Sequence, residues 1–519
     1  MGALAKLSSL ERDYERSGME FDRIVFFLKS PEASKMTESE LEREIEKRTR
    51  ELMRLFLQEH IDGRGEGRCE EGVRGADGID RTRARLQERK IESIFGTIDE
   101  TRAGYGYPGA DSLHPLDAEL NLPAERYSLE LRRRVADQAA GNSFDETYET
   151  IKKSTGAKIS KRQIEELTVS AARDFDAFYQ LRRAETAEGP SGGSILVISA
   201  DGKGVVMRPE DLREHTRKAA KKAKQKMGTR LSKGEKKNRK RMATVAAVYT
   251  VAPYVRKPED LVGKGSFHLD GPLRPRPERK RVWASLEKEP EEVIRQAFEE
   301  ARRRDPDGRK TWVALVDGNW DQIRILKRIA KENELHITII VDLIHVIEYL
   351  WKAGRAFHPE SGPDLEAWVE HRLLKILDGK AGPMAGGMRR SATRQKLSEK
   401  AREPVDTCAS YLLNHAPYLH YDGYLAQGLP VATGVIEGAC RHLVKDRMDV
   451  TGARWSLTGA EAVLRLRALK SSHDFEEYWT FHEACEYKRN HANLYAGGRV
   501  PVVIPAKQNQ IHGHLKVIK

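Results

Sequence analysis

The sequence predicts an α/β protein whose core is a mixed sheet with a helical insertion, preceded by a mainly helical N-terminal region. Apolar runs of strand length at 194–200, 311–316 and 336–341 are separated or followed by helical patterns, as in βα units. Two more strand-like runs, at 242–251 and 281–286, come before this alternation with no helix between them. Three strands followed by alternating strands and helices are the outline of an RNase H-like fold.

The N-terminal part combines helical and loop patterns. Residues 37–60 place a Thr37–Glu40 capping box before apolar side chains at helical spacing, which predicts one long helix. Residues 61–85 are rich in glycine and arginine and have no period, which indicates a linker or flexible loop. Residues 89–106 predict a short hairpin.

A pair of helical patterns lies within residues 143–175, split by Ser154-Thr155-Gly156. Each pattern begins with a capping box, and Lys158, Lys161 and Arg162 stand at the start of the second. This is the outline of a helix-turn-helix that reads DNA, although any helical hairpin gives the same pattern.

The rest of the chain is mostly helical around the strands. Helices are predicted at 290–304, 320–333 and 342–377, with a Gly-, Met- and Arg-rich loop at 379–392 and another helix from near Ile436. The expected regions are a helical N-terminal region with linker (1–88), a DNA-binding region (89–185), a first core part (190–342, with a basic insert at 205–241), a helical insertion (343–430), a second core part (431–490) and a C-terminal tail (491–519).

Composition favours a nucleic-acid partner inside the cell. The 519 residues carry a formal net charge of +12, which suits a polyanion, although a well-solvated surface is the alternative. The cysteines, Cys69, Cys408, Cys440 and Cys485, form no C-x-x-C pair, so zinc-finger and disulfide frameworks are unsupported. No secretory signal and no run of 18 apolar residues is visible, which predicts a cytoplasmic, nucleoid-associated protein without membrane contact.

Three carboxylates form the candidate active site. Asp201 and Asp317 follow the apolar runs of two strands, at the carboxyl ends where α/β sheets place their sites, and a glycine follows each. For a single aspartate a turn cap is the commoner explanation, so the prediction rests on the set. Glu437, near a helix start, is the third candidate. Such a set would hold Mg²⁺, with two ions bridging a phosphate.

Cations lie beside the third acid. Arg441 and Lys445 follow Glu437 at i+4 and i+8, so a continuous α-helix would place all three on one face beside a phosphodiester. An ordinary helical ion pair is the alternative interpretation of this spacing.

A further acid, Asp342, also follows a strand. Asp342 and His345 share a helix face and would make a weak metal pair, but a hydrogen-bonded core histidine is the commoner arrangement. Trp351, further along the same helix, would either stack on an unpaired base or pack in the core.

The most basic stretch of the chain is 217–241, where 13 Lys or Arg are opposed only by Glu235. It falls between the first two strands, close to the expected pocket, which favours contact with a DNA backbone over a merely solvated segment. The residues expected to make these contacts are Lys236, Lys237, Arg239, Lys240 and Arg241.

Several long blocks resemble the Kra-type family of bacterial insertion-sequence transposases, over about residues 89 to 490. The blocks are ADGKGVVMRPEDLREHTRKA, RLSKGEKKNRKRMATVAAVYTVAP, VDGNWDQ, VDLIHVIEYLWKAGRAFHPE and GVIEGACRHLVKDRMDVTGARWSLTGAEAVLRLRAL. The D-x-x-H of Asp342 and His345 is similar to a signature of Mutator- and hAT-like DDE enzymes, where it is linked to holding the active site and the transposon end. The chain departs from some relatives in having no N-terminal cysteine pairs, which makes a zinc module there doubtful.

The resemblance implies a DDE transposase in which Asp201, Asp317 and Glu437 are the catalytic, metal-binding triad with two Mg²⁺ or Mn²⁺ ions. It implies double-stranded DNA as the partner, both as terminal inverted repeats and as target, and at least a homodimer to pair two ends. The reaction implied is cleavage of a phosphodiester followed by attack of the freed 3′-OH on target DNA. A two-metal nuclease or resolvase on the same fold, and a DNA-binding repressor without catalysis, are the alternatives.

Overall fold

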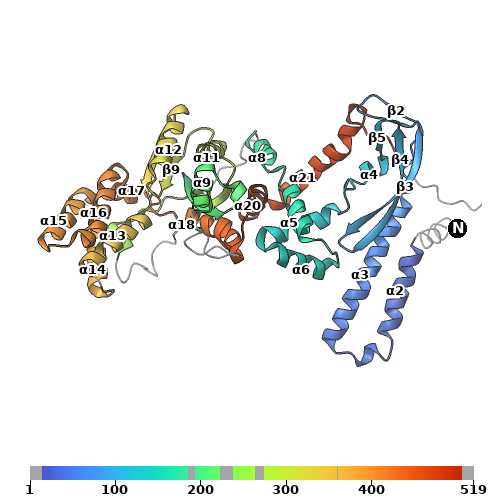
Figure 1. Cartoon of the computed structure of the whole chain (residues 1–519), viewed down its shortest axis with the longest axis horizontal. Coiled ribbons are helices and arrows are strands. Elements are labelled where there is room, and N and C mark those ends of the chain that lie inside the picture. The colour runs from blue at the N-terminus through green and yellow to red at the C-terminus, as the bar shows by residue number, and fades with distance from the viewer. Residues whose placement is uncertain are drawn as a thin grey trace, which may run out of the picture. The chain divides into compact units, whose positions relative to one another are not determined.

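The computed structural model describes residues 14–184, 193–222, 236, 238–262, 274–358 and 360–504. The chain divides into two compact units, one made of Met1–Asp174 with Glu476–Lys519 and the other of Phe175–Phe475 (Figure 1). Residues 476–490, which were expected in the second core part, therefore group with the N-terminal residues. The other expected region boundaries remain predictions.

The first unit combines helices with small antiparallel sheets. Its α-helices are α2 (Glu15–Leu28), α3 (Glu38–Gly63), α4 (Pro115–Glu119), α5 (Leu129–Gly141), α6 (Phe144–Thr155), α7 (Lys161–Ala171) and α21 (Phe475–Asn490). Its strands are β1 (Val73–Arg74), β2 (Asp80–Arg81), β3 (Arg83–Ser93), β4 (Gly96–Tyr107) and β5 (Ala110–Leu113). The order β3-β4-β5 forms one sheet, and β1 pairs with β2.

The prediction of a long helix over 37–60 is confirmed, because α3 begins with the expected Thr37–Glu40 capping box. The prediction of a linker at 61–85 is wrong in part. Val73 pairs with Arg81 in a small hairpin, and Gly72 and Gly78 supply positive φ angles of 79° and 78°. The arginine content that suggested a solvated loop includes the buried Arg81, whose guanidinium binds Asp77 at 2.7 Å.

The predicted helix pair is present as α6 and α7. Both capping boxes form, and Gly156 ends α6 with φ of 76°. A buried cluster that includes Ile151, Ile159 and Ile164 holds the pair together. The pair is therefore a packed unit with its own core, while its contact with DNA stays a prediction.

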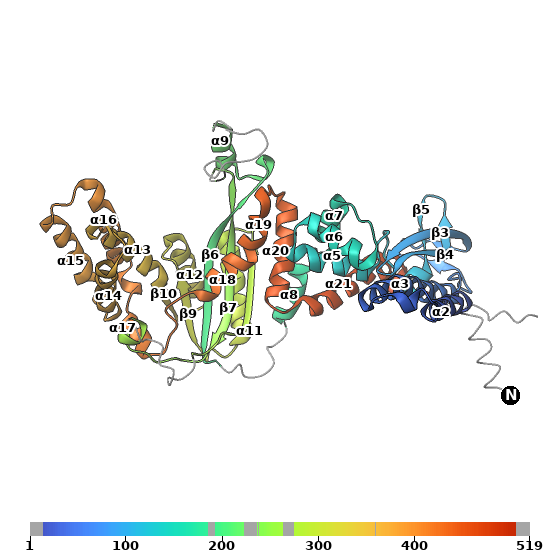
Figure 2. The ribbon, with the colours of Figure 1, turned by 90° about the horizontal axis from the view of Figure 1, so that it is seen from below.

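The second unit is built on a five-stranded mixed sheet (Figure 2). Its strands are β6 (Ile195–Val206), β7 (Lys240–Val251), β8 (Glu278–Ser285), β9 (Thr311–Val316) and β10 (Ile337–Val341), in the order β10-β9-β6-β7-β8. The chain forms an antiparallel meander from β6 to β8, and then β9 and β10 lie parallel to β6 on its other side.

The strands are apolar because both faces of the sheet are covered. Residues 195–200 of β6, 243–250 of β7 and 312–316 of β9 are all buried. The α-helices of this unit are α8 (Phe175–Ala184), α9 (Glu214–Lys222), α11 (Pro290–Arg304), α12 (Trp320–Glu332), α13 (Leu343–Phe357), α14 (Pro363–Leu377), α15 (Ala381–Arg394), α16 (Glu399–Asn414), α17 (Tyr421–Ala426), α18 (Gly434–Ala439), α19 (Asp446–Met448) and α20 (Leu457–Ser471).

Two expectations for this unit are wrong. Most of the expected loop at 379–392 lies in helix α15 (Ala381–Arg394), because Ala385, Met388 and Ala392 are buried at helical spacing and α15 packs on α16. Packing of this kind outweighs the poor helix propensity of glycine. The first strand does not stop at residue 200 either, since β6 continues to Val206 opposite Lys240.

The helices α13 to α16 form a group beside the sheet, as Figure 2 shows. They are contributed by the insertion expected between the two core parts, and α13 packs on both α14 and α16. Within the described part of the chain, no helix has the length and apolarity needed to cross a bilayer.

Candidate functional site

The register of the parallel strands places three aspartates at one level of the sheet. Ser199 pairs with Leu315, and Val316 pairs with Val341. Asp201 and Asp317 each lie two residues beyond the first pair, and Asp342 follows the second. Asp201 was expected to end its strand. Instead it lies within β6, where β6 continues past the end of β9.

Asp201 is held by its neighbours on both carboxylate oxygens. Its Oδ1 accepts a hydrogen bond from the Gly202 backbone N–H at 2.6 Å. Its Oδ2 accepts one from the buried Cys440 thiol, with 3.1 Å between sulfur and oxygen. The half-buried side chain is thus fixed in orientation, and each of its oxygens has a further lone pair that could accept a bond.

Glu437 lies in α18, one helical turn before Cys440. Partial burial and the negative charge of Asp342 raise its pKa; the charges of Glu348 and Asp201 add to this increase, and His345 opposes it. Glu437 is nevertheless solvent-exposed. The structure thus brings Glu437 within electrostatic range of Asp201 and Asp342, and these carboxylates repel one another.

Backbone hydrogen bonds fix the approach to α18. The N–H of Tyr254 donates to the Gly428 carbonyl at 2.9 Å, and the N–H of Leu343 donates to the Val431 carbonyl at 2.9 Å. The segment before α18 is therefore tied both to the end of β7 and to the start of α13. These hydrogen bonds explain how Glu437, although distant from Asp201 in the sequence, reaches the same level of the sheet.

The helix that follows Glu437 is not a continuous α-helix. Residues Cys440–Lys445 form a π-helical turn with i→i+5 hydrogen bonds. The expected α-helical face of Glu437, Arg441 and Lys445 is therefore not formed as predicted. The Arg441 side chain is 73% exposed and lies 3.9 Å from Asp446, and Lys445 is exposed.

Asp317 is held through its backbone. The Tyr411 hydroxyl donates to the Asp317 carbonyl at 2.9 Å, and Nε2 of His415 lies 2.8 Å from the Gly318 carbonyl. Gly318 has φ of 93°, and a Cβ there would lie only 2.8 Å from the Tyr411 oxygen, so glycine is required. Helix α16 of the insertion thus clamps the turn that carries the second aspartate.

Both carboxylate oxygens of Asp342 accept hydrogen bonds from the protein. Asp342 is fully buried, its Oδ1 accepts from the Ile344 N–H at 2.9 Å, and its Oδ2 accepts a short hydrogen bond from the Thr433 hydroxyl. Burial raises its pKa, opposed by these hydrogen bonds and by His345. Asp342 therefore caps α13 and is hydrogen-bonded to Thr433, which precedes α18. Trp351 is half-buried on α13.

The site residues predicted from the sequence did not include Cys440, Tyr411, His415 or Trp320. Trp320 follows Asp317 by three positions and is 44% exposed, and its ring stacks on His415 with centroids 4.8 Å apart. The motif VDGNWDQ contains Trp320, so an aromatic next to a candidate acid was the available signal. Nothing in the sequence pointed to Tyr411 or His415, because both act across a distance of about one hundred residues.

The donor set around Asp201 suits a hard divalent cation. Asp201, Asp317 and Glu437 offer carboxylate oxygens, the ligands that Mg²⁺ and Mn²⁺ prefer. Partial burial, and after it the negative charges of Asp342, Glu348 and Asp201, raise the pKa of Glu437. The place of Asp317 beside Asp201 follows from the register of β9 against β6.

The structure describes only part of the basic segment 217–241. Helix α9 carries the first basic residues, while Lys237 lies outside the described residues. Lys236, Arg239 and Lys240 are half-buried. The Arg241 guanidinium donates to the Leu286 carbonyl at 2.8 Å, so this arginine braces the sheet instead of standing free for phosphate.

In the first unit, Asp174, His482 and Glu486 bring three ligand atoms within 4.8 Å of one another. Arg489 donates to Asp174 at 2.6 Å and also pairs with Glu486, and His482 lies 2.7 Å from Asp174. Burial would raise the pKa of Asp174, yet His482 and Arg489 hold it below its ordinary value. In this cluster the basic groups balance the acidic ones, so we interpret it as a network of ion pairs and not as a metal site.

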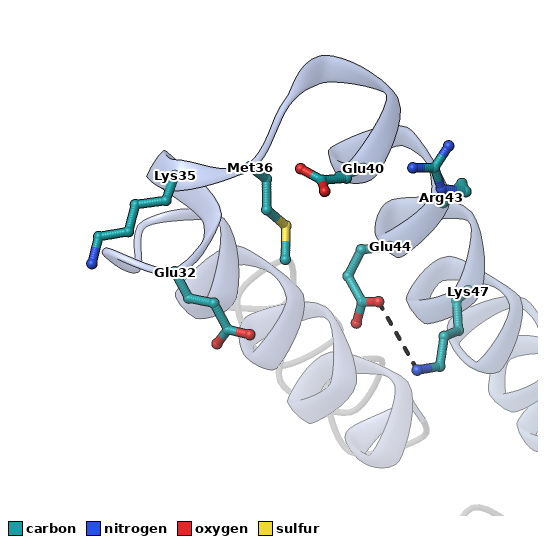
Figure 3. A pocket seen from close by; sticks show the side chains of 7 residues that line it. All are labelled: Glu32, Lys35, Met36, Glu40, Arg43, Glu44 and Lys47. Carbon is teal, nitrogen blue, oxygen red and sulfur yellow. Dashed lines mark ion pairs between the residues drawn. The ribbon is translucent and has the colours of Figure 1, made fainter.

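Each unit also contains a hollow. One, of about 700 Å³, lies in the first unit and is lined by side chains of both charges, including Glu44 and Lys47, which lie 3.9 Å apart (Figure 3). The other, of about 840 Å³, is lined by Tyr249, Tyr254 and Arg256 and by Gly434 at the start of α18. The first mixes charges that neutralise one another, and the second adjoins the helix that carries Glu437.

Comparison of the chain with protein-family models and with curated proteins finds no match in either set.

Proposed function

We propose that this protein is a DDE-type DNA transposase, similar to the Kra-type insertion-sequence enzymes, that binds element ends, cuts them and joins the 3′-OH to target DNA. The observation that carries the proposal is the meeting of Asp201 on β6 with the α18 segment of Glu437 and Cys440. Binding alone needs no such set of carboxylates in a basic protein.

The sheet supports the proposal at the level of fold. An RNase H-like core calls for three antiparallel strands followed by two strands parallel to the first, and the order β10-β9-β6-β7-β8 has this arrangement. The insertion between β10 and α18 is helical, as the sequence predicted.

Each residue of the site has a role that its contacts suggest. Asp201, Asp317 and Glu437 would hold Mg²⁺ or Mn²⁺, which when bound supplies Lewis-acid activation of the attacking oxygen and charge neutralisation at the phosphate. Cys440 orients Asp201, and Tyr411 with His415 fixes the turn of Asp317. Asp342 and Thr433 set the start of α18.

Two other functions remain as alternatives. A nuclease or resolvase with the same carboxylates would cut DNA without joining it. A repressor would bind end sequences through the α6–α7 pair and would be indifferent to metal. The buried braces around Asp201 and Asp317 favour an enzyme, because a DNA-binding surface gains nothing from rigid acids.

The deciding experiment is a strand-transfer assay. Purified protein is mixed with Mg²⁺, a labelled duplex that carries the end of the flanking element, and a supercoiled target plasmid. Asp201→Asn is the test variant, and Asp211→Asn, an acid outside the site in the same unit, is the matched control. Joined product that depends on Mg²⁺, persists in the control and is lost in Asp201→Asn is the expected result.

The other outcomes separate the alternatives. Nicking without joining would favour the nuclease. Specific binding without metal-dependent chemistry would favour the repressor. Full joining by Asp201→Asn would show that the site assignment is wrong.

A further inference from the structure

Helix α12, which follows Asp317, presents a stripe of one aromatic and three basic side chains. Trp320, Arg324, Lys327 and Lys331 are spaced by four, three and four residues, so they fall on one face of the helix. All four are exposed. The stripe begins three residues after the proposed second metal ligand, at the first residue of α12, and extends toward the C-terminal end of the helix.

The aromatic end of the stripe is rigidly supported from behind. Trp320 stacks on His415 at 4.8 Å with 20° between the rings, His415 contacts Tyr411 at 4.4 Å, and Tyr411 stacks on Tyr349 at 4.1 Å. Both ring nitrogens of His415 lie 2.8 Å from carbonyl oxygens, of Tyr411 and Gly318. The indole is thus held in place although 44% of Trp320 is exposed.

A held, half-exposed indole is suited to stacking. An exposed tryptophan loses little conformational freedom on binding when its ring is already packed on one face. Nucleobases stack on such rings without a sequence requirement, since every base has a π face. The position next to Asp317 would place a stacked base close to a phosphate in the proposed active site.

The basic residues suit the phosphates that would follow that base. Among the described residues, Lys327 and Lys331 have no carboxylate partner; Lys327 lies 5.0 Å from the ring of Tyr418. Arg324 pairs with Asp321, which leaves the two lysines as the uncompensated charges. The stripe is about 16 Å long at 1.5 Å per residue, which spans about five nucleotides at the 3.4 Å spacing of one DNA strand.

We propose that this face of α12 is a single-strand DNA binding site, in which Trp320 stacks on an unpaired base next to the cut phosphate while Lys327 and Lys331 contact the backbone beyond it. The inference rests on the proposed function for the placement of the cut phosphate. Single-strand binding itself needs no catalysis and is tested separately.

The test is fluorescence anisotropy of the full chain with two probes, a labelled oligodeoxythymidine of about 15 nucleotides and a blunt duplex of equal length. Trp320→Ala is expected to weaken binding to the single strand by about 5- to 150-fold, the effect of losing one stacked base. Trp320→Phe retains a ring and is expected to recover most of the affinity. Duplex affinity is expected to stay within a factor of about two.

The lysines are tested by salt dependence. Lys327→Ala and Lys331→Ala are each expected to reduce the slope of log K against log salt by about 0.7 on the single strand. Arg309→Ala, an exposed cation elsewhere in this unit, and Tyr107→Ala, an exposed aromatic of the other unit, are the matched controls and are expected to change neither quantity.

Two results would overturn the inference. One is a Trp320→Ala protein that keeps its melting temperature and binds oligodeoxythymidine as tightly as the wild type. The other is equal loss in Trp320→Ala and Trp320→Phe on both probes, which would indicate a general disturbance. If the wild type gives no strand transfer but Trp320→Ala selectively loses single-strand affinity, the single-strand binding site on α12 is supported and the proposed transposase function is contradicted.

Discussion

The Cys440 thiol donates a hydrogen bond to Oδ2 of Asp201, with 3.1 Å between the sulfur and the oxygen. This contact joins the central strand of the sheet to the helix that carries Glu437, two segments that lie far apart in the sequence. Burial and the negative charge of Asp201 raise the pKa of the thiol, so it stays protonated and serves as a donor. The contact therefore orients a carboxylate without adding charge to the site.

Replacing this donor is expected to affect metal use more than folding. Cys440→Ala should lower strand transfer about 10- to 100-fold and raise the Mg²⁺ concentration needed for half-maximal rate, the usual effect of losing an outer-shell partner. Cys440→Ser keeps a donor and should retain most activity. Rates measured across Mg²⁺ concentrations test this, with Cys408→Ala as the buried-thiol control. Unchanged Mg²⁺ dependence in Cys440→Ala would contradict it.

Glu437 is expected to contribute to activity and not to stability. Its raised pKa means that the folded state favours the protonated form, so ionisation disfavours folding as the pH rises through that pKa. Glu437→Gln should therefore melt at or above the wild-type temperature at neutral pH. It should also lose at least about 100-fold in strand transfer, as expected for removal of a charge-stabilising group.

Thermal melts and strand-transfer rates on the same preparation check this pair of outcomes. Added Mn²⁺ should raise the melting temperature of the wild type and have less effect on Glu437→Gln, since binding to the folded state stabilises it. A variant that melts well below the wild type would show that Glu437 is a structural residue.

Gly318 is expected to be irreplaceable. Alanine there meets a φ of 93° and a contact of 2.8 Å with the Tyr411 oxygen. Gly308 has φ of 66° but open space around a Cβ, so Gly308→Ala isolates the backbone strain, about 1–2 kcal/mol. Gly318→Ala should destabilise the protein by more than Gly308→Ala and reduce strand transfer about 10-fold or more. Calorimetry and initial rates compare the two, and equal effects would argue against the clamp by α16.

A buried ion cluster on α11 is expected to make stability depend on acid pH. Burial alone would raise the pKa of Glu300, but Arg281, Arg304 and Arg303 bring it down to about 2. Because the folded pKa lies below the unfolded value of about 4.3, the stabilisation is complete above that pH and is lost as the pH falls toward 2.

Glu300→Gln leaves these arginines without their carboxylate and should cost about 3–5 kcal/mol at neutral pH. Calorimetry should show the gap between wild type and Glu300→Gln narrowing between pH 4 and the lowest pH at which the protein folds. Glu292→Gln, on the exposed side of α11, should change stability by less than about 0.5 kcal/mol. A gap that stays constant with pH would contradict the assignment.

Local patterns determined most of the elements. Strands such as β9 and β10 were predictable because their residues are apolar on both faces, and α6, α7 and α11 because capping residues and a leading proline mark their starts. The same patterns placed Asp317 at the end of its strand. These signals involve only residues that are close together in the chain, so the sequence alone is enough to detect them.

The tertiary structure alone decided the rest. Asp201 lies within β6 because β7 continues as its partner to Lys240, and the end of a strand depends on that partner. Helix α15 forms from a glycine-rich stretch because α16 packs on it. The thiol of Cys440 reaches Asp201, and Tyr411 and His415 reach the turn after Asp317, through contacts between distant segments. No local pattern encodes such contacts, since they arise only when packing brings the segments together.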